Sequence, residues 1–203
     1  LNTRSRMVQN ECHNPYEMHR TLLRGFDRKR EEANVLHRLD IHPETGAITL
    51  LVQSTVQPDW QPLSEVGQGQ YLLAPPQWKA VEPDLPPGRR LRFRLTANPT
   101  LKKVRRDEQG ARRNSNRVPL VHEDKQLEWL HGRADAHGFR LLDVHLTQPT
   151  QQTAHKKAIT LFTVQYNGLL EITHAEKFQT ALRMGIGPAK AFGCGLLSLA
   201  PSR

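Results

Sequence analysis

A glycine-rich segment near the C-terminal end restricts the fold of this chain more than any other feature of its sequence. Within eleven positions it contains Gly185, Gly187, Gly193 and Gly195, together with Pro188. Neither a helix nor a central strand accommodates this composition, because glycine loses much backbone entropy on folding and proline lacks the N–H that a ladder needs. We therefore predict a loop here, between a helix and a strand, with exposed backbone amides.

Two interpretations of this glycine loop remain open. Its glycines either provide the positive φ angles of a tight connection, or expose N–H groups that cradle a nucleic-acid backbone, with Lys190 adding positive charge. The spacing matches neither the dinucleotide fingerprint nor the P-loop, and both of those motifs follow a strand. We therefore expect no nucleotide cofactor, and no other cofactor is predicted.

The charge of the chain predicts a polyanionic partner, of which nucleic acid is the commonest. The 203 residues include 29 Lys and Arg against 20 Asp and Glu, which gives a net charge of +9. Eleven of these basic residues, and only two acidic ones, fall within residues 89–117. We call residues 102–117 the basic segment and predict that it contacts nucleic acid through Lys102, Lys103, Arg105, Arg106, Arg112, Arg113 and Arg117.

Other features exclude several classes of protein. The sequence has no run of eighteen apolar residues, no signal peptide and no CxxC pair, since Cys12 and Cys194 lie far apart. We therefore expect a soluble, cytoplasmic protein without a membrane partner, a zinc site or a disulfide framework. No acidic cluster has the spacing of nuclease metal ligands, so no metal site is predicted. Because the chain begins at Leu1 and not at a methionine, we expect residues to be missing before it, which would clip a first strand.

Residues 82–88 contain three prolines and a glycine and predict a linker between two domains, residues 1–86 and 89–203. In the first, Asn14 to Glu17 is typical of a helix start, with a capping residue followed by proline. This helix should run to about Phe26. Further predicted elements are strands at 35–40 and 47–52, a helical turn near Ser64 and a strand near Trp78.

The second half repeats this order. Thr173 to Glu176 reads as a capping box that opens a helix, and Gly185 lies where that helix should end. A strand over 158–172 contains Asn167-Gly168, a hairpin dipeptide that could split it. Strands at 91–96, 139–144 and 196–200 and a helix at 123–137 complete an α+β fold of two tandem ferredoxin-like (RRM-like, βαββαβ) domains.

One histidine stands out among the ten in the chain. RNA can be cleaved without metal when its own 2′-hydroxyl attacks the phosphate, which requires proton transfers that histidine performs near neutral pH. Only His19 follows a tyrosine, Tyr16, by three residues on a well-capped predicted helix, so the two share a face. The alternative is that His19 is a hydrogen-bonded residue at the edge of an apolar helix face, and spacing alone leaves both open.

Aromatic residues are scarce, at 6% of the chain, and Phe93 is the only one in the strand 91–95. A sheet that stacks RNA bases needs aromatic side chains on its central strands. Scarce aromatics with abundant arginine favour recognition of the backbone and shape of a duplex or hairpin.

Four segments of the chain resemble a known family. Its C-terminal sequence from Gly185 to Pro201, GIGPAKAFGCGLLSLAP, is similar to the ending of the CasE (Cse3) family, the type I-E CRISPR precursor-RNA endoribonucleases. The segments from Phe93 to Pro99, from Arg117 to Leu120 and from Tyr16 to His19 support the resemblance, which covers essentially the whole chain.

The resemblance implies cleavage of the CRISPR repeat RNA at the base of its hairpin, leaving a 2′,3′-cyclic phosphate and a 5′-hydroxyl. It implies that His19 and Tyr16 are catalytic, that the basic segment grips the hairpin, and that Lys190 and the glycine loop hold backbone near the junction. Expected partners are the repeat hairpin, as precursor and as mature guide RNA, and the backbone and other subunits of the Cascade complex. The main competing hypothesis is a non-catalytic RNA-binding protein with tandem ferredoxin-like domains, and a metal-dependent nuclease is the third.

Overall fold

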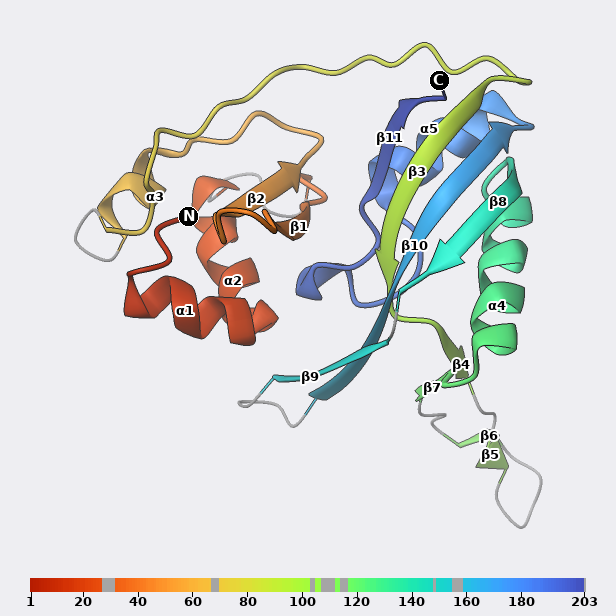
Figure 1. The fold of residues 1–203 in the computed structure, drawn as a ribbon, viewed down its shortest axis with the longest axis horizontal. Helices are drawn as coiled ribbons and strands as arrows, with labels where there is room; N and C mark the ends of the chain where they lie inside the picture. The colour runs from red at the N-terminus through yellow and green to blue at the C-terminus, as the bar shows by residue number, and fades with distance from the viewer. Residues whose placement is uncertain are drawn as a thin grey trace.

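The computed structural model describes residues 1–26, 32–66, 70–102, 105–106, 112–113, 117–147, 149–154 and 159–202. Figure 1 shows two units side by side, with the N-terminal half on the left and the larger sheet of the C-terminal half on the right. A long extended segment joins them across the top. Among the described residues, none of the helices has the length and apolar character needed to span a lipid bilayer.

The N-terminal half is built from short helices and one antiparallel strand pair. Its elements are α1 (Arg6–His13), α2 (Pro15–Leu22), the 3-10 turn η1 (Leu23–Phe26), β1 (Leu36–Ile41), β2 (Ile48–Gln53) and α3 (Gln61–Glu65). The predicted helix start at Pro15 and both predicted strands are confirmed, although Asn14 makes no side-chain capping bond. Helix α1 was not predicted, because its sequence RMVQNECH offers only short apolar spacing.

A buried carboxylate joins the two helices of this half. Glu11 of α1 accepts hydrogen bonds from Thr21 Oγ1 of α2 and from the Tyr71 hydroxyl, both at 2.6 Å. Burial raises the pKa of Glu11 above its ordinary value, although both hydrogen bonds oppose this shift. The three side chains hold α2, and with it the proposed catalytic face, against α1.

The strand predicted near Trp78 is absent, and that prediction was wrong. Residues 75–86 run extended without β pairing, and Trp78 itself is exposed. Prolines recur in this stretch, and each removes a backbone donor that a ladder would need. The described residues therefore contain two of the four strands that a complete N-terminal module would have, and the domain boundary after residue 86 stays a prediction.

The C-terminal half has the complete predicted order of elements. These are β3 (Arg90–Ala97), α4 (Glu123–Ala136), β8 (Phe139–Leu146), β10 (Ile159–Ile172), α5 (Ala175–Met184) and β11 (Leu197–Pro201). The strands form an antiparallel sheet in the order β11-β3-β10-β8. The α+β ferredoxin-like class is thus confirmed.

The core of this half lies between the sheet and helices α4 and α5. Leu91, Phe93 and Leu95 of β3 point into it, where they join Leu130 of α4 and Phe178 of α5. Arg90, Arg92 and Arg94 alternate with these residues and are exposed, so β3 presents arginines on the opposite face of the sheet. Smaller strand pairs extend from this sheet: β4 (Thr100–Lys102) with β7 (Arg117–Pro119), β5 (Arg105–Arg106) with β6 (Arg112–Arg113), and β9 (Thr150–Ala154) with the start of β10.

Two local predictions in this half are corrected. Strand β10 runs through Asn167-Gly168 without a hairpin, because pairing with both β3 and β8 holds it extended. The cap of α5 is His174, without a side-chain capping bond, and the predicted capping box does not form. The N–H groups of Thr173 and His174 donate instead to the Gly138 carbonyl.

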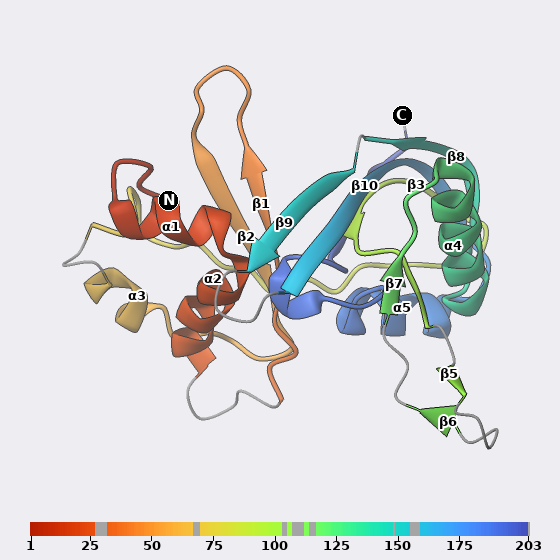
Figure 2. The ribbon, with the colours of Figure 1, turned by 90° about the horizontal axis from the view of Figure 1, so that it is seen from below.

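The two halves meet where α2 and β1 pack against η3 (Lys190–Phe192), the 3-10 turn within the glycine loop (Figure 2). Gln53 Nε2 of β2 also donates to the Leu182 carbonyl of α5 at 2.6 Å. Next to η3, His37 of β1 is 2% exposed, and its Nδ1 has no hydrogen-bond partner among the described residues. Burial, with a smaller contribution from the charge of His19, lowers the pKa of His37 to about 4.

We expect Gly168→Ala to destabilise the protein. A Cβ at this position of β10 would lie 2.1 Å from the Asp143 carbonyl oxygen of β8, where the strand register shifts. Overpacking of this kind costs about 1–3 kcal/mol in free energy of unfolding, measured by urea denaturation. Gly132→Ala, on an open face of α4, is the control and should stabilise by up to about 1 kcal/mol. Equal stability of Gly168→Ala and the wild type would contradict this packing.

We also expect acid to weaken the fold through His37. Unfolded His37 takes up a proton below about pH 6.5, whereas folded His37 does so only near pH 4, so its stabilising contribution is complete above pH 6.5 and is lost as the pH falls through this range. The full difference is roughly 3 kcal/mol, at about 1.36 kcal/mol per pKa unit.

Urea denaturation across this pH range measures the effect. His37→Phe keeps a flat ring without a titrating group, so its free energy of unfolding should fall less steeply with acid than that of the wild type. Parallel curves for the two proteins would show that His37 does not contribute.

Candidate active site and nucleic-acid interface

The two predicted catalytic side chains lie where α2 meets β1 and the glycine loop. Both Tyr16 and His19 are half-buried. The Tyr16 ring lies 6.2 Å from the ring of Phe192 in η3, measured between centroids. The His19 ring stacks on His37 of β1 at 6.0 Å, with the planes inclined by 20°. His19 therefore lies at the edge of the core and is partly exposed. One face of its ring packs against the buried, neutral imidazole of His37.

The glycine loop is a tight connection that packs closely on both halves. Its four glycines all have positive φ, between 73° and 90°, so the tight-connection interpretation is confirmed. A Cβ on Gly185 would lie 2.9 Å from both methyl groups of Leu36, and one on Gly187 would lie 2.9 Å from the Trp129 ring. The phosphate-cradle interpretation does not conflict with this geometry and stays a prediction.

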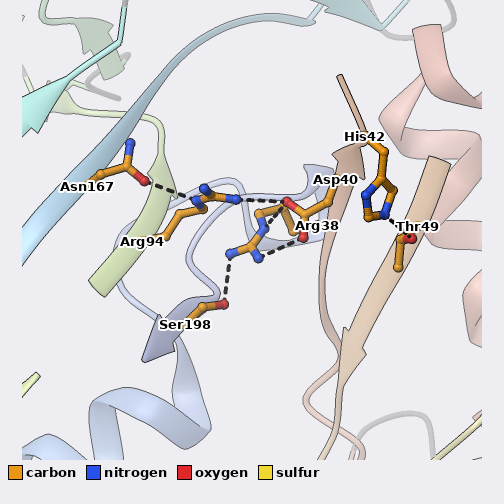
Figure 3. Close-up of polar contacts among 7 residues, drawn as sticks. All are labelled: Arg38, Asp40, His42, Thr49, Arg94, Asn167 and Ser198. Carbon is orange, nitrogen blue, oxygen red and sulfur yellow. Dashed lines mark hydrogen bonds and ion pairs between the residues drawn. The ribbon is translucent and has the colours of Figure 1, made fainter. Parts of the chain in front are cut away.

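A network of charged side chains ties β1 to the sheet of the other half (Figure 3). Arg38 donates from Nε and Nη2 to the two carboxylate oxygens of Asp40, each at 2.9 Å, and from Nη1 to Ser198 Oγ of β11 at 2.8 Å. Arg94 of β3 reaches the same carboxylate at 3.5 Å and donates to Asn167 Oδ1 of β10 at 3.0 Å. The hydrogen bonds and charge of Arg38 hold the pKa of Asp40 below its ordinary value.

This network sets the position of the stacked histidines. Arg38 follows His37 directly in β1, so the clamp that fixes Arg38 against β11 also fixes the strand behind His19. At the far end of the same strand pair, His42 Nε2 and Thr49 Oγ1 lie 3.1 Å apart (Figure 3). The proposed catalytic ring is therefore supported by a strand that is itself anchored to the opposite half.

Two hollows adjoin the glycine loop. One, of about 120 Å³, lies between the halves and is lined by residues that include Glu11, Met18 and His37. The other, of about 270 Å³, has a basic lining: Arg117, Arg133, His137, Gly185, Gly187, Pro188 and Lys190. Burial lowers the pKa of Lys190 from its ordinary value. The structure thus brings four predicted RNA contacts to one hollow: Arg117, Lys190, Gly185 and Gly187.

The remaining predicted RNA contacts lie farther along the basic segment. Lys102 is exposed at the end of β4 and pairs in register with Arg117 of β7. The backbones of Arg105 and Arg106 pair with those of Arg113 and Arg112. Lys103 lies outside the described residues. In Figure 1 the strands β5 and β6 lie far from α2, so the predicted RNA contacts on these strands and His19 are in separate parts of the molecule.

Sequence reasoning missed several residues of this region. Arg38, Arg133 and His137 have no motif around them, because their partners are distant in sequence: Arg38 and Ser198 are 160 positions apart. No sequence pattern around His37 indicated that it belongs to this site, although it directly precedes the buried Arg38.

Within the ranges that the structure describes, no three or more His, Cys, Asp or Glu side chains are grouped so that they could hold a metal ion. The expectation of metal-independent chemistry stays a prediction.

Comparisons with known proteins agree with the resemblance seen in the sequence. A family model described as CRISPR associated protein matches residues 1–201. The chain is 37% identical over 217 residues to the CRISPR-associated endoribonuclease Cse3 of Thermus thermophilus, with 99% of this chain and 97% of that protein covered. It is 39% identical over 129 residues to the CRISPR system Cascade subunit CasE of Escherichia coli, covering 61% of this chain and 64% of that protein.

Solved structures show the same relationship. Thermus thermophilus Cse3 bound to an RNA representing a pre-cleavage complex superposes with a TM-score of 0.85 at 37% identity, covering 99% of this chain and 96% of that one. Cas6e from Escherichia coli superposes with a TM-score of 0.67 at 30% identity, covering 93% of both chains. With its family model, its full-length relative and its fold in agreement, the chain belongs to the CasE (Cse3) family of CRISPR-associated proteins.

Proposed function

We propose that this protein is a metal-independent endoribonuclease that binds the hairpin of a CRISPR repeat in precursor RNA and cleaves at the 3′ base of the hairpin. One observation carries the proposal: His19 and Tyr16 lie half-buried beside the glycine loop, at the junction of the two halves. The relative that covers nearly the whole chain is named an endoribonuclease, and its structure was solved with RNA in a pre-cleavage complex.

The proposed reaction needs two proton transfers and no water. The 2′-oxygen loses its proton and attacks the adjacent phosphorus, and the bond from phosphorus to the 5′-oxygen breaks as that oxygen gains a proton. The products are a 2′,3′-cyclic phosphate and a 5′-hydroxyl. His19 and Tyr16 move these two protons, one each: one side chain takes the proton of the 2′-hydroxyl and the other gives a proton to the leaving 5′-oxygen. A positioned general acid or base accelerates such a step by about 10² to 10⁴-fold.

In this proposal RNA binding and RNA cleavage are assigned to different parts of the surface. The basic segment neutralises phosphates of the hairpin stem through Lys102, Lys103, Arg105, Arg106, Arg112, Arg113 and Arg117. Lys190 and the amides of the glycine loop, Gly185, Gly187, Gly193 and Gly195, hold the backbone beside the junction.

We further propose that the processed hairpin stays bound within a Cascade complex in the cytoplasm, in contact with the backbone subunit. A curated relative is itself named a Cascade subunit, and solved surveillance complexes contain similar chains at 25% identity. Residues 1–86 form the catalytic domain in this proposal, and residues 89–203 form the domain that grips RNA.

His19→Ala should abolish cleavage and leave hairpin binding nearly unchanged. Removing the proton-transfer group should lower the single-turnover rate at saturating protein by at least about 10²-fold. The assay contains EDTA and includes a second RNA with a 2′-deoxy nucleotide just upstream of the scissile phosphate, which should not be cut.

His131→Ala, at an exposed position of α4, is the matched control and should cleave normally. Full cleavage by His19→Ala would remove His19 from the mechanism, and cutting of the 2′-deoxy RNA would exclude 2′-hydroxyl attack. Tight binding without cleavage of either RNA would support the non-catalytic alternative.

Replacing Arg112 and Arg113 together with glutamine should weaken binding and flatten its dependence on salt. Each lost phosphate contact should reduce the slope of log affinity against log salt by about 0.7–0.9. Fluorescence anisotropy with a labelled hairpin at several salt concentrations measures the slope. The control replaces Arg4 and Arg6, which are exposed near α1, and should keep the slope of the wild type. An unchanged slope in the Arg112/Arg113 variant would mean that the basic segment does not grip the stem.

A further inference from the structure

The basic hollow beside the glycine loop is built from elements other than those that carry the proposed catalytic residues. Its lining, named here the α4 cup, consists of Arg117 from β7, Arg133 from α4, His137 just after α4, and Gly185, Gly187, Pro188 and Lys190 of the glycine loop. None of the lining residues belongs to α1, α2 or β1. The cup is therefore distinct from the surface formed by Tyr16 and His19.

The cup gathers positive charge without acidic partners in its lining. Arg117, Arg133 and Lys190 contribute three cations, and the lining contains no carboxylate. Among the described residues, no ion pair is formed by Arg133 or Lys190. Three cations at one hollow repel one another, so a bound anion would relieve a cost that the free protein carries.

Two of the three cationic groups contact neighbouring side chains. The Arg133 guanidinium lies over the Trp129 ring, 5.3 Å from its centroid, and Arg117 Nη1 donates to Thr100 Oγ1 at 3.4 Å. Gly187 approaches the same Trp129 ring, which therefore lies under both the arginine and the loop. A site whose charges are already positioned loses less entropy when it binds a ligand.

The cup also offers neutral donors. The N–H of Gly187 donates to no backbone carbonyl in the part of the chain that the structure describes. His137 is half-buried, and burial together with the charges of Arg133 and Lys190 lowers its pKa. The volume of about 270 Å³ is several times that of a water molecule, about 30 Å³, and admits a tetrahedral phosphate with its waters. Charge, donors and size all match a single phosphate group.

We propose that the α4 cup binds one internal backbone phosphate of the RNA, close to the cleavage junction but different from the scissile phosphate. This proposal rests on the proposed function. The turn η3 places Lys190 in the cup and Phe192, two residues later, against Tyr16. An RNA strand that has one phosphate bound in the cup therefore passes the catalytic face. The bound phosphate fixes which nucleotide of that strand lies beside Tyr16 and His19.

The test measures binding with hairpins that cannot be cleaved, because they carry a 2′-deoxy nucleotide at the cleavage site. Each hairpin of a series has one neutral methylphosphonate in place of one phosphate near the junction. The proteins compared are the wild type, Arg133→Gln and the control Lys125→Gln, which removes a positive charge from α4 outside the cup. Thermal unfolding of each variant checks its fold, and Lys190→Gln is a second cup variant that leaves the Trp129 contact intact.

We expect Arg133→Gln to bind the unmodified hairpin about tenfold more weakly, as the loss of a charge-assisted hydrogen bond predicts. At one internal position the methylphosphonate should weaken wild-type binding more than it weakens binding by Arg133→Gln or Lys190→Gln, because each variant has already lost part of the contact with that phosphate. Lys125→Gln should behave as the wild type at every position.

Two outcomes would overturn the proposal. One is equal sensitivity of the wild type and both cup variants to every methylphosphonate. The other is displacement of wild-type protein from the hairpin by inorganic phosphate while no position has a reduced effect in the variants, which would make the cup a site for free phosphate. Failure of the wild type to bind any hairpin would instead contradict the proposed function, so the two failures can be told apart.

Discussion

The hydrogen bonds of the buried Arg38 guanidinium, which join the two halves, are the interaction on which the rest of the structure depends. Arg38 lies in β1 of the N-terminal half, yet it binds Ser198 in the last strand of the C-terminal half and shares Asp40 with Arg94 of β3. A buried ion pair adds little net stability, because desolvation opposes the attraction of the charges. Its planar donors point in fixed directions, however, and they set the angle at which β1 meets the sheet. The stacked pair of His37 and His19 depends on that angle.

The glycine loop contacts both proposed functional surfaces, the catalytic face at Tyr16 and the α4 cup. Its positive φ angles let the chain leave α5, turn within a few residues and enter β11 while packing on both halves. In this short path it presents Phe192 to Tyr16 and Lys190 to the α4 cup. The unusual composition is thus explained by packing alone, and the proposed contacts with phosphate use the surface that this packing leaves open.

Chemistry and affinity have different physical requirements, and the molecule separates them. Proton transfer needs a titratable ring near neutral pH that is held at one distance from a ribose, which suits the half-buried junction at His19. Affinity for RNA needs many cations that neutralise phosphates, which suits the composition of the basic segment. The buried neutral His37 adds no competing charge near His19 at neutral pH.

The sequence by itself determined the elements whose signals are local: the helix that begins at Pro15, the β strands on either side of residues 42–46, and the complete order of the C-terminal half. Only the tertiary structure decided what depends on partners distant along the chain. Asn167-Gly168 reads as a turn, yet β10 continues through it because strands on both sides pair with it. Residues near Trp78 read as a strand, yet they pair with no strand among the described residues. The contacts of Arg38 and the α4 cup form only when segments far apart in sequence come together in the fold. No local sequence pattern predicts these contacts.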